Sequence, residues 1–254
     1  MRKQLNSVVL AFSMCGLAST AFSQEAGSVV VTGGAAWIDM TLSSAEEVKS
    51  SSQFGTFTSP GTGAEIHNTF TGELLVTYFA TEHIAIEGAV GIPPKLNFYA
   101  HGVVAPLGPQ GPSMPVGDLK PLVSARVWAP TLFVKYYFGQ KDSVWRPFLG
   151  VGVNYTWFSS VQLHPAFAGA LGQFAGPGGR ADASASSSWN PAFSAGVTYR
   201  LNDRWSVLGS ITYIPLKTTG RFNAVSANGT TVLSNTSRIT ANPIIGFVGV
   251  SYRF

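Results

Sequence analysis

The sequence predicts an all-β protein, an eight-stranded antiparallel transmembrane β-barrel. Three observations lead to this fold class: few charged residues, apolar residues at every second position, and connections that alternate between short and long. Charged residues make up only 11% of the 254 residues, while aromatic residues reach 12%. Soluble domains carry roughly 25% charged residues. Because a surface so poor in charge is unsuited to water, much of it is expected to face lipid.

The first 23 residues are expected to be a signal peptide, outside the folded domain. Arg2 and Lys3 precede an apolar run over residues 8–18, and the segment 21–23 offers a cleavage site before Gln24. The barrel domain is therefore expected over residues 24–254. Cys15 is the only cysteine and lies in the signal peptide, so the exported barrel is expected to be held by packing and hydrogen bonds without disulfides.

Alternation of residue types predicts the strands. They are expected at about 28–40, 73–80, 84–92, 131–138, 148–157, 190–201, 205–215 and 244–254. One face of a strand is apolar, while the opposite face carries Gly, Ser, Thr and a few charges. In lipid every backbone polar group must be paired within the protein, so such strands span only as a closed barrel. Their even number fits a single-chain bacterial barrel.

Connection length predicts the orientation of the barrel. Residues 81–83, 139–143 and 202–203 are short turns, whereas 41–67, 94–121, 159–187 and 220–237 are long connections. Outer-membrane barrels have short periplasmic turns and long extracellular loops, so the protein is expected in the bacterial outer membrane with both ends periplasmic. Aromatic residues near strand ends predict interfacial girdles; they are Tyr78, Tyr136, Trp157, Tyr199, Trp205 and Tyr252.

Soluble β-folds also alternate, but they place polar residues outside and apolar residues inside. That arrangement would leave a soluble barrel with too few charges on its surface. Four prolines at or within the expected strands, Pro130, Pro191, Pro215 and Pro243, cannot donate to a ladder. We expect them at bulges or near the outer rim, where strand pairing ends.

The inward face mixes apolar and small residues. The interior candidates are Leu75, Phe79, Ala89, Phe133, Phe148, Leu208, Thr212 and Phe247. Eight strands leave an interior hardly wider than its own side chains, which excludes a broad water-filled porin. These residues either line a narrow site for an apolar guest or form a packed core, and the sequence leaves both interpretations open.

Four charged residues are expected inside, near the periplasmic end: Glu87, Lys135, Arg200 and Arg253. Isolated charges in a narrow interior are costly, so these groups are expected to pair into a polar plug. Such a plug would confine an apolar guest to the upper barrel or make it leave sideways through the wall. The alternative is a set of charges solvated by trapped water.

Several segments resemble the outer-membrane protein W (OmpW) family: "LLVTYFATEHIAIEGAVGIP" (74–93), "APTLFVKYYFG" (129–139), "WRPFLGVGVNYTWF" (145–158), "SWNPAFSAGVTYRLNDRWSV" (188–207) and "GVSYRF" (249–254). The resemblance implies a small barrel that binds or passes small hydrophobic molecules. It also implies an assembly signal, read by the barrel-assembly machinery, in Val248, Val250, Tyr252 and Phe254. At Ala89 and Thr212 the chain is small or polar where relatives carry bulkier apolar residues, so the resemblance carries no apolar constriction to these positions.

Other functional classes find little support in the sequence. No cluster of Lys and Arg suggests nucleic acid as a partner. The histidines, His67, His83, His101 and His164, form no ligand pair, and neither a phosphate loop nor a nucleophile elbow occurs. We therefore expect no enzyme, metal or cofactor. The expected partners are outer-membrane lipid, the assembly machinery and a small hydrophobic ligand. A structural barrel whose loops contact phage, toxin or host is the alternative function.

Overall fold

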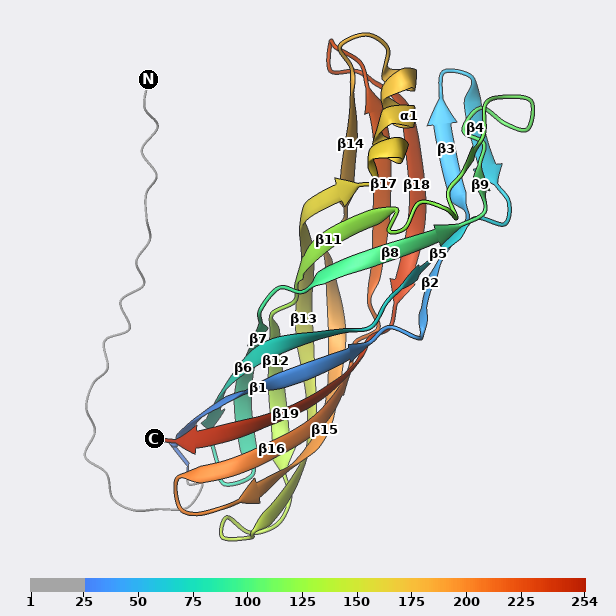
Figure 1. Ribbon diagram of the computed structural model, residues 1–254. Helices are drawn as coiled ribbons and strands as arrows, with labels where there is room; N and C mark the ends of the chain where they lie inside the picture. Colours follow the sequence, from blue (N-terminus) through green and yellow to red (C-terminus); the bar gives the residue numbers. More distant parts are fainter. Residues whose placement is uncertain (1–25) are drawn as a thin grey trace, which may run out of the picture.

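The computed structural model describes residues 26–254, and the expected signal peptide lies outside them. The described chain forms a barrel that continues at one end into an elongated extension of strands and one helix, α1 (Pro165–Ala175) (Figure 1). In the described part, no helix has the length and apolar character needed to cross a membrane.

Eight strands close the barrel, as predicted. They are β1 (Val29–Asp39), β6 (Thr69–Phe79), β7 (Ile84–Gly91), β12 (Thr131–Tyr137), β13 (Trp145–Leu163), β15 (Ser188–Arg200), β16 (Trp205–Tyr213) and β19 (Ile244–Arg253). Each pairs antiparallel with its neighbour in this order, and β19 returns to pair with β1 from Val30↔Arg253 to Asp39↔Ile244. The described barrel therefore has no free edge, as a sheet in lipid requires.

The register places the apolar face outside, as the alternation predicts. Val151 on β13 is 60% exposed, while Asn154 on the same strand is fully buried. The outward apolar band includes Leu74, Val76, Ile86, Val90, Leu132, Val134, Leu149, Val153, Phe193, Ile211, Val248 and Val250. Aromatic pairs flank this band, with Trp145 against Tyr199 at the turn end and Tyr155 against Trp189 at the other. Such a band matches the lipid-facing belt of an outer-membrane barrel.

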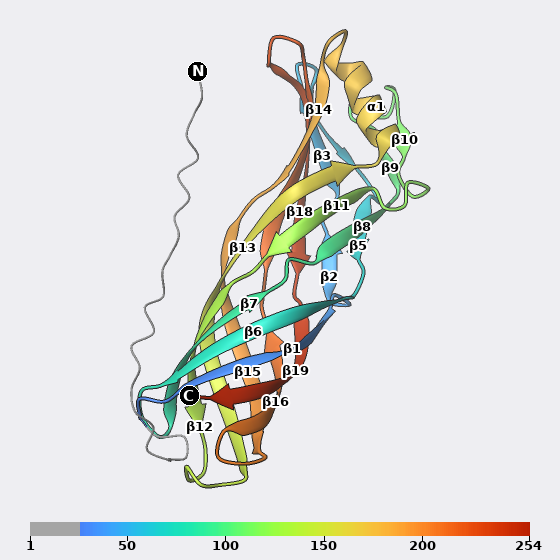
Figure 2. The ribbon, with the colours of Figure 1, turned by 60° about the vertical axis from the view of Figure 1, so that its left-hand side comes forward.

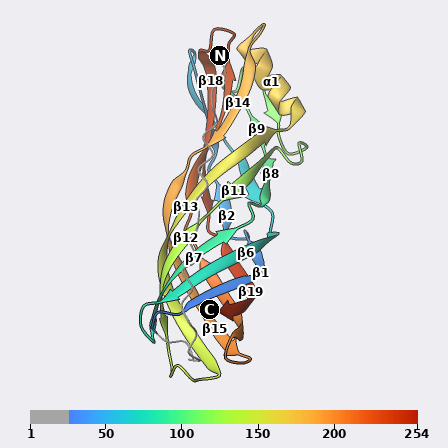
Figure 3. The ribbon, with the colours of Figure 1, turned by 90° about the vertical axis from the view of Figure 1, so that its left-hand side faces the viewer.

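The long connections, which the sequence analysis treats as loops, contain regular structure. One sheet joins β14 (Arg180–Ala185), β17 (Lys217–Val225), β18 (Thr231–Ala241), β3 (Val48–Ser52) and β4 (Gly55–Ser59), with β2 (Ser43–Ala45) pairing to β18. The barrel sheet is extended by β5 (Gly63–Ile66), β8 (Lys95–His101) and β11 (Val123–Trp128), and β9 (Val103–Val104) pairs with β10 (Met114–Pro115). Figures 2 and 3 show α1 lying along this extension beside β14.

A separate apolar core explains why the extension folds. Phe167 and Leu171 of α1 are buried with Leu233 of β18 and Val123 of β11. The helix begins at Pro165, after His164, whose ring nitrogen accepts a hydrogen bond from the Ala166 amide. The apolar face of α1 thus packs against the sheet of β14, β17 and β18 in the extension.

Three of the four strand prolines lie where strands are interrupted, as expected. Pro130 separates β11 from β12, Pro215 separates β16 from β17, and Pro243 separates β18 from β19. Pro191 differs, because it lies within β15 opposite Val153 of β13. Pairing between β15 and β16 begins only at Phe193, so β15 carries its proline beyond the end of that ladder.

Candidate functional site

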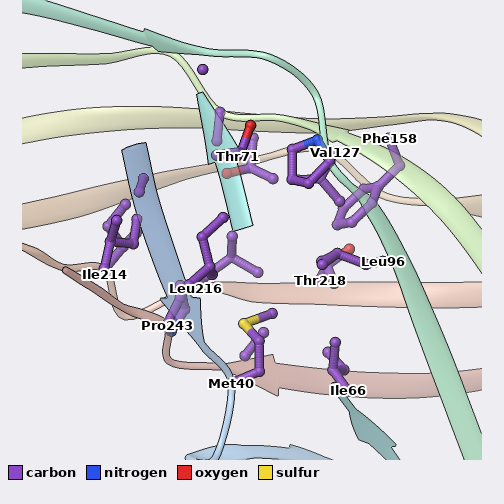
Figure 4. A pocket seen from close by; sticks show the side chains of 18 of the residues that line it. Met40, Ile66, Thr71, Leu96, Val127, Phe158, Ile214, Leu216, Thr218 and Pro243 are labelled. Carbon is purple, nitrogen blue, oxygen red and sulfur yellow. The ribbon is translucent and has the colours of Figure 1, made fainter. Parts of the chain in front are cut away.

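An apolar chamber of about 100 Å³ lies where the barrel meets its extension (Figure 4). Aliphatic and aromatic side chains make up most of its wall, including Met40, Leu96, Phe98, Leu216 and Ile239. They come from segments that are far apart in sequence, among them β1, β8 and β18. A dry cavity of about 150 Å³ is enough to bind benzene, so the chamber has the scale of a site for part of a small apolar molecule.

A second cavity of about 50 Å³ lies beside the chamber and is more polar. Glu73, Ala129, Ile214 and Ile245 line both spaces, so the two lie next to each other, and together they are called the interior site. The smaller cavity is further lined by the hydroxyls of Ser194, Ser210 and Thr212 and by Glu87 and Lys135. We call the first space the chamber and the second the lower cavity.

A buried ion pair borders the lower cavity. Lys135 Nζ lies 2.5 Å from Glu87 Oε1, and both side chains are at most 2% exposed. The second carboxylate oxygen of Glu87 accepts a hydrogen bond of 2.8 Å from the Thr77 hydroxyl. The Lys135 ammonium also lies 4.2 Å from the centre of the Phe148 ring. The pair is thus compensated by a hydrogen bond and an aromatic face, as buried charges require.

Between the Glu87–Lys135 pair and the turn end of the barrel lies a layer of aromatic side chains. We call the ion pair and this layer together the floor. The rings of Phe79 and Phe148 each lie 5.0 Å from that of Tyr137. Arg146 packs over this layer, 5.3 Å from the Tyr137 ring, and donates a 2.5 Å hydrogen bond to the Glu82 carbonyl in the β6–β7 turn. The interior beneath the ion pair is therefore filled, which agrees with the narrow bore of eight strands.

The expected four-residue polar cluster is divided between two levels. Glu87 and Lys135 meet as expected, but Arg200 and Arg253 line a different pocket at the turn end, together with Arg146 and other residues. Arg200 donates to the Asp142 backbone carbonyl and lies 3.8 Å from its carboxylate. Our expectation of one plug from all four side chains was wrong, because Arg200 binds Asp142 at the rim and Arg253 lines the same rim pocket, away from the Glu87–Lys135 pair.

Two glycines make room for the floor. A Cβ atom at Gly150 would lie 2.9 Å from Lys135 Cγ, and one at Gly196 would lie 2.6 Å from the Phe148 ring. Real Cβ atoms do not approach other atoms so closely. Glycine at these inward positions therefore lets the side chains of Lys135 and Phe148 lie flat against the neighbouring strands β13 and β15.

The barrel wall is interrupted beside the chamber. Pairing between β7 and β12 ends at Ala89↔Thr131 and resumes where the Val127 amide donates to the Pro94 carbonyl. Neither Pro93 nor Pro94 has an N–H to offer. Gly91, Pro94, Val127 and Ala129 from this break also line the chamber. Exposed apolar residues flank the break on the outside, namely Val90, Ile92, Trp128 and Leu132.

Buried Asn154 stabilises one side of this break. Its side-chain amide donates to the carbonyls of Ala129 and Pro130, and Thr156 and Asn190 donate to its oxygen. The Ala129 carbonyl next to the break is thereby satisfied, while the Pro130 carbonyl also accepts a hydrogen bond from the Tyr155 amide. The interruption of strand pairing therefore has hydrogen bonds of its own, which stabilise it within the barrel wall.

The structure distributes the predicted interior residues over two levels. Leu75, Ala89, Phe133, Thr212 and Phe247 line the lower cavity, whereas Phe79, Phe148 and Leu208 line neither cavity and pack in the core.

The chamber itself was missed, because Ile66, Leu96 and Phe98 lie in segments interpreted as loops. Apolar alternation at Leu96 and Phe98, and again at Ile214 and Leu216, is the signal that could have revealed it.

The predicted assembly residues lie on the strand that closes the barrel. Val248 and Val250 face outward on β19, and the rings of Tyr252 and Phe254 are 4.9 Å apart. The Phe254 amide donates to the Val29 carbonyl at the start of β1. Among residues 26–254, no three His, Cys, Asp or Glu side chains converge to form a metal site.

Similarity to solved structures supports the same architecture. The crystal structure of the outer-membrane protein OprG from Pseudomonas aeruginosa superimposes with a TM-score of 0.71 at 22% identity, covering 91% of this chain and 98% of that one. The solid-state NMR structure of the outer-membrane protein AlkL gives a TM-score of 0.57 at 20% identity, over 94% and 95% of the two chains. Both similarities concern the fold.

Sequence comparison identifies the family. Outer membrane protein W of Vibrio cholerae is 26% identical over 249 residues, which span 95% of this chain and 99% of the relative. Outer membrane protein W of Escherichia coli is 27% identical over 254 residues, 99% of this chain and all of the relative. The OmpW family model matches residues 25–254. The chain therefore belongs to the OmpW family and is an outer-membrane β-barrel.

Proposed function

We propose that this barrel takes up small hydrophobic or amphipathic molecules into the chamber and releases them sideways into the outer membrane. The observation that carries the proposal is the position of the chamber. It is apolar, it lies above the Glu87–Lys135 pair, and it borders the wall break at Pro94 and Ala129. A guest in the chamber faces a filled, charged interior below and an apolar, lipid-facing rim at its side, so burial of its apolar surface favours lateral release.

Uptake of radiolabelled octane by cells that lack other family members tests the proposal. Ala241 is buried in the chamber wall, so Ala241→Trp should fill the site and lower the initial rate several-fold. Ala227 is exposed between β17 and β18, and Ala227→Trp should leave the rate unchanged. Both variants are compared at equal amounts of heat-modifiable barrel. Equal rates for Ala241→Trp and the parent would refute a role for the chamber.

A floor substitution separates the lateral route from an axial one. Phe79→Ala removes a ring from the aromatic layer beneath the ion pair. If octane leaves through the wall break, this change should not alter its uptake. A higher octane rate in Phe79→Ala would show passage down the barrel axis and would overturn the lateral route.

Contact with a partner at the cell surface is the second candidate function. The observation that favours it is the folded extension, in which α1 and the six-stranded sheet share their own buried core. The test is deletion of residues 165–175. Loss of phage, toxin or host attachment with unchanged octane uptake would support this function for the extension.

A further inference from the structure

Within the described part of the chain, Glu73 presents a carboxyl group to the interior site without forming a hydrogen bond or ion pair of its own. It projects from β6 and lines both the chamber and the lower cavity. Within residues 26–254, no partner lies within hydrogen-bond or ion-pair distance of this carboxyl group. The other charged residues lining these spaces are Glu87 and Lys135, which bind each other at 2.5 Å. The site as a whole therefore carries one excess acidic group, at the junction of its two parts.

Glu73 is half-buried in largely apolar surroundings, so its carboxyl group gains from a partner. Removal of a charged or polar group from water without a compensating hydrogen bond is costly. The neighbouring ammonium of Lys135 is already engaged by Glu87 and by the Phe148 ring. A guest that brings its own donor would satisfy Glu73, and its apolar part would extend into the chamber against Leu96, Leu216 and Ile239.

From this arrangement we infer that Glu73 is a specificity-determining residue that binds the head group of amphipathic guests. The chemical class it selects is the primary alkylamine, whose ammonium group donates to the carboxylate while its alkyl chain fills the chamber. An alkyl carboxylate of the same length would place a like charge against Glu73 and Glu87, and this repulsion disfavours its binding. The inference rests on the proposed function, since it assumes that the chamber receives guests.

Two methionines make the chamber observable. Met40 lines the chamber, whereas Met114 lies in the extension against α1, and they are the only methionines in residues 24–254. Barrel labelled with ¹³C at the methionine methyl groups and held in lipid nanodiscs would be titrated with hexylamine, hexanol and hexanoate. The Met40 signal then reports occupation of the chamber, and the Met114 signal shows whether an additive acts elsewhere.

A conservative substitution isolates the carboxylate. Glu73→Gln keeps the size and hydrogen-bonding capacity of the side chain but removes its negative charge. Glu65→Gln is the matched control, because Glu65 is exposed on β5. Both proteins would be compared with the parent by the same titration and by heat modifiability, so that loss of the fold is recognised.

The parent should bind hexylamine roughly tenfold more tightly than hexanoate, since hydrogen bonds to charged groups are among the stronger ones. Glu73→Gln should weaken hexylamine about tenfold, leave hexanol unchanged and strengthen hexanoate, while Glu65→Gln should match the parent. Equal affinities for all three molecules in the parent, or an unchanged preference in Glu73→Gln, would overturn the role of Glu73 and leave the proposed function standing. A Met40 signal that responds to none of them would instead overturn the proposed function, and the inference with it.

Discussion

The Glu87–Lys135 pair allows a quantitative test of how the barrel interior is stabilised. The perturbation is a double-mutant cycle with Glu87→Gln, Lys135→Met and the combined variant. Lys135→Met keeps the length of the side chain and its contact with Phe148 but leaves the Glu87 carboxylate with only the Thr77 hydroxyl at 2.8 Å. Breaking a buried pair in this way costs about 3–5 kcal/mol of unfolding free energy, because one charge is left uncompensated.

The combined variant should be far more stable than the two single effects would suggest. Neither an amide nor a thioether carries charge, so the desolvation penalty disappears with the attraction, and replacing both members of a buried pair is often nearly neutral. Because Lys135→Met alone costs about 3–5 kcal/mol and the combined variant is nearly neutral, the expected coupling energy is at least about 3 kcal/mol, at or above the upper end of the usual range for contacting residues.

Reversible urea unfolding in lipid vesicles, followed by tryptophan fluorescence, measures these free energies. Asp142 and Arg200 provide a matched control in the same barrel, because they lie 3.8 Å apart with side chains that are 67% and 31% exposed. Their cycle, with Asp142→Asn and Arg200→Met, should give a coupling of about 0.2–1 kcal/mol. A coupling for Glu87 and Lys135 no larger than that of the control would refute the view that the buried pair is one compensated unit.

Three further predictions concern other parts of the molecule. Val151→Arg should lower the unfolding free energy by about 2–4 kcal/mol, because it places a charge in lipid. A lipid-soluble quencher should reach a spin label at residue 151 but not one at residue 154, and the reverse result would contradict the register. Phe254→Asp should reduce the heat-modifiable barrel in outer-membrane fractions, because β19 closes on β1 at this residue; unchanged levels would argue against an assembly role. Lys135→Met alone should leave single-channel ion conductance unchanged, whereas the double variant Phe79→Ala/Lys135→Met should raise it, because the aromatic layer lies beneath the ion pair. A higher conductance in Lys135→Met alone would show that the ion pair by itself blocks the passage of ions.

The barrel could be predicted from the sequence because its strands obey a strict period of two. A shift of one residue would turn Asn154 outward and Val151 inward, so the pattern determines the register wherever one face contacts lipid. The inward position of Glu87 and Lys135 follows from the same rule, and their proximity follows from the short turns that hold neighbouring strands at similar heights.

The extension and the chamber could not be predicted in the same way. The strands β3, β4 and β14 are rich in Ser, Ala and Thr and lack a continuous apolar face. Here β14 packs against α1 and pairs with β17, while β3 pairs with β18, which is distant in sequence, so the partners that stabilise these strands are set by tertiary contacts.

Different levels of the barrel interior contribute to stability and to the proposed function. An eight-stranded barrel closed by regular ladders has little free space, and here its interior is occupied by rings, an ion pair and the glycines that accommodate them. The chamber lies above this level, where prolines interrupt the ladders and the wall is continued by β8, β11, β17 and β18. The break that weakens strand pairing at Ala129–Pro130 is the same feature that brings the chamber to the lipid, and Asn154 compensates it with hydrogen bonds. In the proposed function, loss of ladder pairing at this height is the structural requirement for lateral release, while the filled lower barrel keeps the fold stable.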